Sequence, residues 1–147
     1  MAHVRQSIRD NIVTTITSLS TTGSNVYRTR IYPLEHGNLP GLCVYTATED
    51  SEIDTMGSSR STDRNCEFLI EAFVRANTGY DNTMDTICAE IEAAMATDST
   101  RGGNAKDSTL IRSEFEFSDE GDKPMAMARL TYSVRYRTLI NDATSAT

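Results

Sequence analysis

The chain has 147 residues and a mass of 16.2 kDa, which suits one domain of ordinary size. Acidic residues outnumber basic ones by 21 to 14, and the formal net charge is −7. That charge disfavours a duplex-binding domain, because neutralising phosphates usually requires a face rich in lysine and arginine. Hydrophobic residues make up only 38% of the chain, so we expect a modest core and much polar surface.

The sequence lacks the marks of a membrane or secreted protein. No apolar run approaches the roughly 18 residues that a membrane-spanning helix needs, and the amphipathic segment MAHVRQSIRDNIVTT does not resemble a secretory signal. We therefore expect a soluble protein made in a cytoplasm. The three cysteines, Cys43, Cys66 and Cys88, lie in separate apolar runs, which predicts buried free thiols.

The first half of the chain predicts one helix and two strands. Apolar residues recur every three or four positions from Val4 to Leu19, as on one face of a helix. Two extended segments rich in β-branched and aromatic residues follow, Val26 to Tyr32 and Leu42 to Thr48. Residues 49–62, EDSEIDTMGSSRST, hold four acids before their first base and are expected to form a long mobile loop.

The second half predicts three strands and a second helix. Side chains alternate between two faces from Cys66 to Ala76, and the presence of Leu69 and Phe73 on the charged face predicts that this face is partly covered. A helix is expected from Asp81 to Ala96. The other expected elements are a polar loop at 98–107, a strand from Leu110 to Phe117, a long strand from Met125 to Thr138, and a fraying tail, NDATSAT.

The resulting order is α-β-β-loop-β-α-β-β, in which strands come in runs rather than in alternation with helices. This order favours an α+β fold with a mostly antiparallel sheet of about five strands and two helices packed on one face. We expect one such domain over residues 1–140 and a flexible C-terminal tail at residues 141–147.

The sequence contains no clear motif for catalysis or for metal binding. His3, His36 and the cysteines lack the close spacing of zinc ligands, and His36 lies in a loop that contains proline and glycine. The segment RGGNAKDS lacks the spacing of a phosphate-binding loop. We therefore expect no catalytic residue, no metal and no cofactor.

Arginines are predicted on exposed sheet faces, where they either contact the phosphates of a nucleic acid or form ion pairs with acidic side chains. Arg28 and Arg30 share one strand face, and Arg129, Arg135 and Arg137 share another. The acids available on neighbouring strands are Glu67, Glu71, Glu114 and Glu116. We favour pairing, either across strands or between subunits, which is typical of an interaction or assembly protein.

The order of several segments supplies a family resemblance. The helix HVRQSIRDNIVTTITSL is followed by TTGSNVYRTRIYPL, by LPGLCVYT and by a strand that ends in FLIEAFVRA. The helix DTICAEIEAAMATD and the strand MARLTYSVRYRT come later. From about His3 to Thr138, these segments resemble the tail terminator (tail completion) proteins of long-tailed bacteriophages, the group that includes the minor tail protein U of lambda-like phages.

The resemblance implies a structural virion protein without catalysis or cofactor. Proteins of this group form a six-fold ring on the head-proximal end of the tail tube, where they end tube polymerisation and offer the surface to which the head connector docks. The implied partners are further copies of the chain in a hexamer, the major tail tube protein, and a head–tail connector or neck protein. DNA would pass through the lumen without specific binding, no membrane is involved, and assembly would take place in the host cytoplasm.

Two sets of residues are candidates for this role. The first set is expected to form ion pairs between subunits or with the tube, and comprises Arg28, Arg30, Glu67, Glu71, Arg135 and Arg137. The second set is expected to lie in a loop that projects into the lumen or onto the tube, where negative charge would repel DNA, and comprises Glu49, Asp50, Glu52 and Asp54.

Two alternatives stay open at the level of sequence. One is another neck or head-closure protein. The other is a small acidic hydrolase or ligand-binding domain that uses His36 and nearby carboxylates. Hexameric rings would favour the terminator, whereas a stable monomer with a deep pocket would favour the enzyme.

Overall fold

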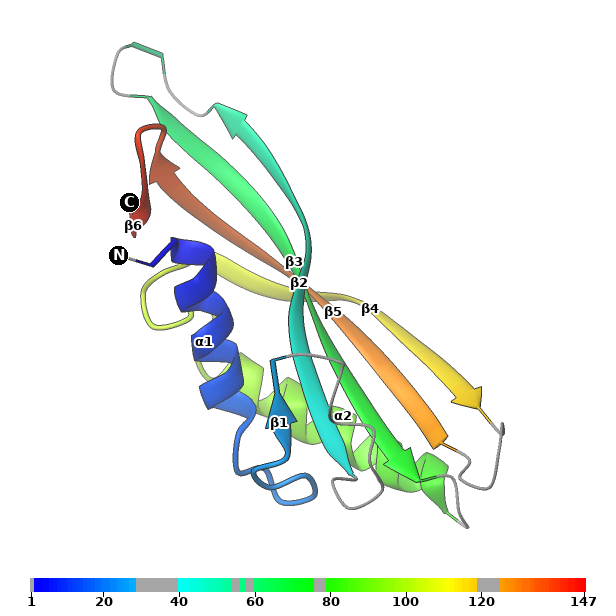
Figure 1. The fold of residues 1–147 in the computed structure, drawn as a ribbon. Helices are drawn as coiled ribbons and strands as arrows, with labels where there is room; N and C mark the ends of the chain where they lie inside the picture. The colour runs from blue at the N-terminus through cyan, green and yellow to red at the C-terminus, as the bar shows by residue number, and fades with distance from the viewer. Residues whose placement is uncertain (1, 29–39, 54–55, 58–59, 76–78, 119–124) are drawn as a thin grey trace.

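A twisted sheet with both helices on one of its faces forms the body of the protein (Figure 1). The computed structural model describes residues 2–28, 40–53, 56–57, 60–75, 79–118 and 125–147. In chain order the elements are α1 (Val4–Ile16), β1 (Val26–Tyr27), β2 (Gly41–Ile53), β3 (Ser61–Arg75), α2 (Tyr80–Ala96), β4 (Asp107–Ser118), β5 (Met125–Leu139) and β6 (Asp142–Ala146). This arrangement confirms the predicted α+β class, with three strands rather than two after the second helix.

The sheet is built around the antiparallel pair β3 and β5. The strand order is β1-β2-β3-β5-β4, and β6 pairs with β5 beside this path. β1 runs parallel to β2, and the other pairs are antiparallel. β3 and β5 pair without a shift from Ser61 opposite Leu139 to Arg75 opposite Met125. Because paired residues point to the same side of a sheet, this register fixes which side chains face the helices.

The core lies between that sheet face and the helices. Ile8, Ile12 and Ile16 of α1 are 0% exposed, so the predicted apolar stripe is confirmed, although α1 ends three residues before Leu19. The buried residues of α2 are Met84, Ile87, Cys88, Ile91 and Met95. They pack against alternate residues of the central strands, including Phe68 and Ile70 of β3 and Leu130 and Tyr132 of β5. Each large side chain buried here stabilises the fold by roughly 1.5–3 kcal/mol.

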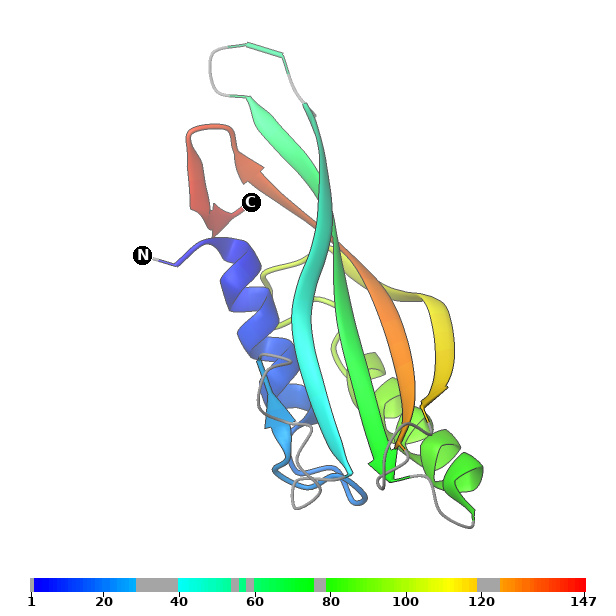
Figure 2. The same cartoon turned by 45° about the vertical axis from the view of Figure 1, so that its right-hand side comes forward.

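Each strand that flanks the central pair contains one β-bulge. In β2 the pairing shifts after Thr46, and in β4 it shifts after Leu110. Thr46 is opposite Phe68, Leu110 is opposite Tyr132, and Phe68 and Tyr132 are themselves paired, so both bulges adjoin one cross-strand row. Bulges increase the local twist of a strand, which agrees with the sharp turn of the sheet near its middle (Figures 1 and 2).

The expectation of a long loop at residues 49–62 is wrong. β2 continues to Ile53 and β3 begins at Ser61, with Glu49 opposite Cys66 and Ile53 opposite Thr62. The charged residues of β2 still form a strand here, because the neighbouring β3 supplies backbone hydrogen-bond partners for them. β3 is itself held by its pairing with β5 on the other side. We call Glu49–Ile53, Ser61–Cys66 and the tip residues Met56, Gly57 and Arg60 the arm; it extends past the helices (Figure 2).

The expectation of a fraying tail at residues 141–147 also fails, because most of this segment forms β6. Thr138 pairs with Ala146 and Leu139 pairs with Asp142. The Thr147 N–H donates to the carbonyl of Arg137, and Lys106 Nζ donates to the carbonyl of Thr147 over 2.7 Å. A polar composition does not prevent pairing when the end of a long strand offers free backbone groups.

The predicted polar loop at 98–107 closes the C-terminal end of α2. Arg101 is fully buried, and its guanidinium donates to the backbone carbonyls of Met95 and Asp98. The Asp98 carboxylate accepts hydrogen bonds from the Thr100 hydroxyl and from the N–H of Gly102, which lower the pKa of Asp98 to about 2. Arg101 therefore satisfies one free carbonyl in the last turn of α2, that of Met95, and also bonds the loop that follows the helix.

Candidate functional site: the arm and the polar face

The sheet face opposite the helices, which we call the polar face, carries charged side chains from four strands. Near the arm it forms an open groove of about 740 Å³. The groove is lined by Asp50, Ser51, Glu52, Asp63, Arg64, Asn65, Asp107, Thr109, Ser133 and Arg135. Acids outnumber bases in this lining, so the groove has the electrostatic character of a surface that repels anions.

Two ion pairs join β3 to β5 across the polar face. Arg135 donates to both carboxylate oxygens of Asp63, with nitrogen–oxygen distances of 3.3 and 3.1 Å, and the Arg135 side chain is 63% exposed. Arg129 Nε donates to Glu71 Oε2 over 2.9 Å, and the Glu71 side chain is 0% exposed. The bond to Glu71 raises the pKa of Arg129. The exposed pair contributes little to stability, whereas breaking the buried pair would leave an uncompensated charge.

The polar face becomes apolar away from the arm. Cys43, Phe73 and Met127 form a small buried cluster there, and Met125 packs against it. Phe73 is buried and Leu69 is half-buried, as expected for a partly covered face, although both helices pack on the opposite side of the sheet.

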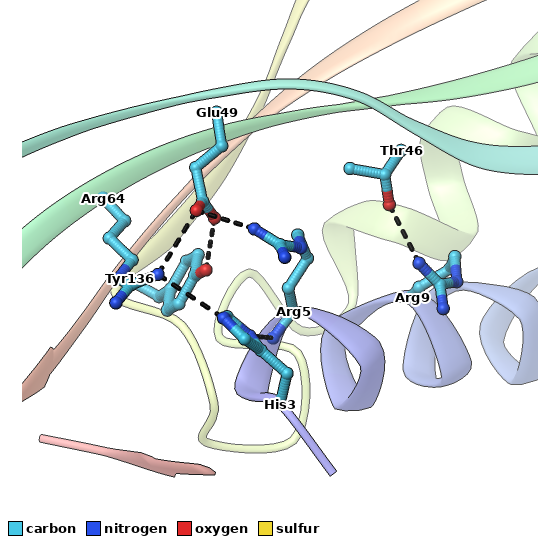
Figure 3. A network of polar contacts seen from close by, with 7 residues as sticks. All are labelled: His3, Arg5, Arg9, Thr46, Glu49, Arg64 and Tyr136. Atoms are coloured by element: carbon cyan, nitrogen blue, oxygen red, sulfur yellow. Dashed lines mark hydrogen bonds and ion pairs between the residues drawn. The ribbon is translucent and has the colours of Figure 1, made fainter. Parts of the chain in front are cut away.

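A polar network on the opposite face ties α1 to the base of the arm (Figure 3). Glu49 Oε2 accepts from Arg5 Nη1 over 2.7 Å and from Arg64 Nη1 over 3.3 Å, and its other oxygen accepts from the Tyr136 hydroxyl. The Arg64 guanidinium also lies over the Tyr136 ring. Burial and the bond to Glu49 raise the pKa of Tyr136. One carboxylate thus joins α1, β2, β3 and β5.

His3 begins α1 and contacts the same network. Its Nδ1 accepts from the backbone N–H of Arg5 over 3.0 Å, which satisfies one of the free donors of the first helical turn. Its Nε2 lies 3.4 Å from Arg64 Nη1. Burial, followed by the positive charges of Arg5 and Arg64, lowers the pKa of His3, so the ring is neutral at neutral pH.

The residues predicted to form ion pairs between subunits or with the tube lie on more than one surface of the protein. Glu67, Glu71, Arg135 and Arg137 share the polar face, but Arg28 pairs with Asp10 of α1 over 2.6 Å, and Arg30 lies outside the described residues. Glu67 accepts a hydrogen bond from Thr48 in its own chain. Glu71 pairs with Arg129 rather than with Arg135 or Arg137 among the contacts that the structure describes.

The acids of the predicted loop point in different directions. Glu49 faces the helices and is held by Arg5 and Arg64, whereas Asp50 and Glu52 line the groove. Asp54 lies outside the described residues. Neighbouring strand residues point to opposite faces, and the bulge after Thr46 decides that Glu49 rather than Asp50 faces the helices, because one extra residue reverses the alternation.

Sequence reasoning missed the partners of Glu49, namely Arg5, Arg64 and Tyr136. A regular strand starting at Leu42 would place Glu49 with Cys43 on the polar face. The bulge overturns that count, and nothing in the composition of residues 42–49 marks its position.

The cysteines are confirmed as buried free thiols. Burial raises the pKa of Cys66 to about 12 and that of Cys88 to about 11, which disfavours the reactive thiolate. Within the described part of the chain, no group of three or more His, Cys, Asp or Glu residues is placed to hold a metal ion. His36, the histidine of the hydrolase alternative, is not among the described residues.

In the same described ranges, no helix is both long enough and apolar enough to cross a membrane.

Comparison with known proteins gives a distant structural likeness. No family model and no curated protein sequence matches the chain. A solved structure described as "Virion of native gene transfer agent (GTA) particle" contains a chain that is 17% identical, with a TM-score of 0.42. The alignment covers 92% of this chain and 92% of that chain.

Because the network around Glu49 depends on one negative charge, we predict that removing this charge lowers the stability of the fold. Glu49→Gln keeps the shape of the side chain but removes the negative charge that holds two guanidinium groups. We expect the free energy of unfolding, measured by urea denaturation of dilute protein, to fall by about 1–3 kcal/mol. The matched control is Glu52→Gln in the same strand, which is exposed and is expected to change stability by less than about 0.5 kcal/mol. Equal effects of the two variants would contradict this role.

His3 predicts a dependence of stability on pH. Because its folded pKa lies below the ordinary value of 6.5, the unfolded chain binds the proton more readily. Its contribution is therefore present above about pH 6.5 and is lost as pH falls. We expect His3→Asn, which keeps a capping acceptor but cannot titrate, to lose less stability than the wild type between about pH 7.5 and 5.5. Parallel urea midpoints for the two proteins across this range would disprove the prediction.

Proposed function

We propose that this protein is a structural virion protein of the tail terminator kind. It forms a ring of identical subunits, most simply a hexamer, on the head-proximal end of the tail tube. The ring ends tube polymerisation and provides the docking surface for a head connector or neck protein. It performs no catalysis and needs no cofactor.

The observation that carries this proposal is the match between the resembling segments and the elements of the fold. HVRQSIRDNIVTTITSL contains α1, LPGLCVYT begins β2, and FLIEAFVRA ends β3. DTICAEIEAAMATD covers most of α2, and MARLTYSVRYRT lies within β5. The similarity is thus spread over the helices and strands that build the sheet and its core, rather than limited to one motif.

Open sheet edges support assembly from identical subunits. β1 pairs only with Leu42 and Cys43 of β2, and β4 has no strand on its outer side among the residues that the structure describes. Unpaired edges bind other strands readily, and stable proteins cover them or use them. Two different edges on one subunit are suited to a head-to-tail contact, which closes into a ring when the rotation allows it.

The acidic residues of the polar groove support the proposal that DNA passes this surface without adhering to it. Asp50 and Glu52 face this groove together with Asp63 and Asp107. We propose that this side of the arm faces the lumen or the tube, whereas Glu49 keeps the arm attached to α1. A map of the assembled tail that placed Asp50 and Glu52 on the outer rim would contradict the lumen assignment.

The central test is tube capping. The purified protein would be added to polymerising tubes of the major tail protein encoded near its gene, and the tubes would be imaged by negative stain. We expect rings, seen on one end only, and tubes that no longer elongate. Continued elongation with no ring would contradict the proposal, and binding to a head connector but not to tubes would favour the neck-protein alternative.

We predict that replacing Arg135 affects assembly, and that a charge swap separates this effect from the loss of its ion pair within the chain. The Arg135 side chain is 63% exposed on the polar face, where it forms an ion pair with Asp63 of its own chain. We expect Arg135→Glu to raise the concentration needed for half-assembly by about fivefold. The swap Arg135→Glu with Asp63→Arg restores the pair within one chain. If Arg135 also meets another subunit or the tube, the swap leaves assembly impaired, and full recovery would limit Arg135 to its own chain.

A further inference from the structure

We propose that the tip of the arm of one copy docks into an apolar hollow beside β4 of a second copy. This inference deepens the proposed function, on which it rests, by naming one of the contacts that join the subunits of the ring.

The hollow lies where the N-terminal end of α2 meets the C-terminal end of β4. Its apolar lining includes Tyr80 and Met84 of α2 and Phe115 and Phe117 of β4, and its volume is about 150 Å³. The rings of Tyr80 and Phe117 are 5.6 Å apart and form one wall. A space of this order accommodates an apolar group of about the size of benzene.

The aromatic residues of β4 are not covered by their own chain. Phe115 is 61% exposed and Phe117 is 54% exposed, although both point to the side of the sheet on which the helices pack. α2 covers this side only in part, because its buried residues face β3 and β5. Single exposed apolar residues are ordinary, but two aromatic rings beside an apolar hollow indicate a binding surface.

The arm tip carries the complementary apolar residues. Ile53 is 55% exposed and Met56 is 92% exposed. Methionine is flexible and adapts to irregular apolar spaces, so Met56 is well suited to enter the hollow.

The positions of the two surfaces require a second copy. In both views the arm lies at the opposite end of the sheet from the start of α2 and the end of β4, whose residues line the hollow (Figures 1 and 2). The tip and the hollow therefore cannot meet within one chain. A contact between different surfaces of identical subunits is head-to-tail, which is the geometry that closes rings. In this contact, the arm of one copy also lies against the edge strand β4 of the next.

The charges around the two surfaces are complementary. Asp81 and Glu116 line the hollow and are exposed. Arg60 is an exposed residue of the tip, where its Nε donates to the carbonyl of Gly57 over 2.9 Å. Opposite charges around an apolar contact favour one orientation and increase the association rate. Because one chain holds both the apolar and the charged halves, a second copy of this chain is the occupant that fits.

Cross-linking tests the contact directly. A Met56→Cys protein and a Phe115→Cys protein of different mass would be mixed and treated with a short bis-maleimide. The native cysteines are 0%, 0% and 8% exposed, so background reaction is low. We expect a mixed dimer from this pair. The matched control replaces Met56→Cys by Ala93→Cys, on the exposed side of α2, and is expected to give none. Assembly without the mixed dimer, or equal dimers from both mixtures, would overturn the inference.

A charge swap gives a second readout by analytical ultracentrifugation. We expect Met56→Asp to raise the concentration for half-assembly at least about tenfold, and Arg60→Glu to raise it by about fivefold. Adding Glu116→Arg to Arg60→Glu should return it to within about twofold of the wild type. No change in Met56→Asp, or no recovery in the swap, would contradict the docking.

The two levels of the proposal fail in different ways. If the protein caps tubes but gives no mixed dimer, the docking is wrong and the proposed function stands. If the mixed dimer forms but the tubes are not capped, the docking stands and the proposed function is wrong. If Met56→Cys cross-links to the tube protein instead, the tip binds the tube and the contact between copies is overturned.

Discussion

The unshifted pairing of β3 with β5 is the constraint on which the rest of the structure depends. It extends from Ser61 to Arg75 and assigns each residue of both strands to one face. Phe68, Ile70, Leu130 and Tyr132 consequently meet the helices, while Glu71, Asp63 and the arginines of β5 lie on the polar face. A slip of one residue would place these charges in the core, so the register is protected by the cost of burying them.

The bulge after Thr46 adds the second level of organisation. It directs Glu49 toward α1 while its neighbour Asp50 faces the groove. The same short segment therefore attaches the arm to the body and presents acids on the opposite side. The arm is held at its base by partly buried polar contacts and carries exposed residues at its tip, an arrangement suited to reaching another subunit.

Elements with a periodic apolar pattern were predictable, and features decided by single residues were not. The spacing of Ile8, Ile12 and Ile16 and the alternation from Cys66 onward identified a helix and a buried strand, because burial imposes these periods. Composition predicted a loop for Glu49–Ile53 and a fraying tail for Asp142–Ala146, but both segments are strands. In both, backbone pairing to a long neighbouring strand outweighs the effect of polar side chains. For the site, the roles that the sequence suggests for Arg135 and the acids of the arm stay predictions, and the Glu49 network depends on a bulge that no local pattern reveals.

The bulges in β2 and β4 have a consequence for how the protein can vary. They adjoin one row across the sheet, beyond which Cys66, Val134 and Tyr136 still belong to the core, while the arm continues past the helices. Past the Glu49 network, β3 still pairs with β5 as far as Ser61, so adding or removing residues in cross-strand pairs preserves the faces when the change falls at the tip end of the β2–β3 ladder. The length of the arm can therefore change at its tip without a change in the core, which, under the proposed function, would let one body suit rings and tubes of different dimensions.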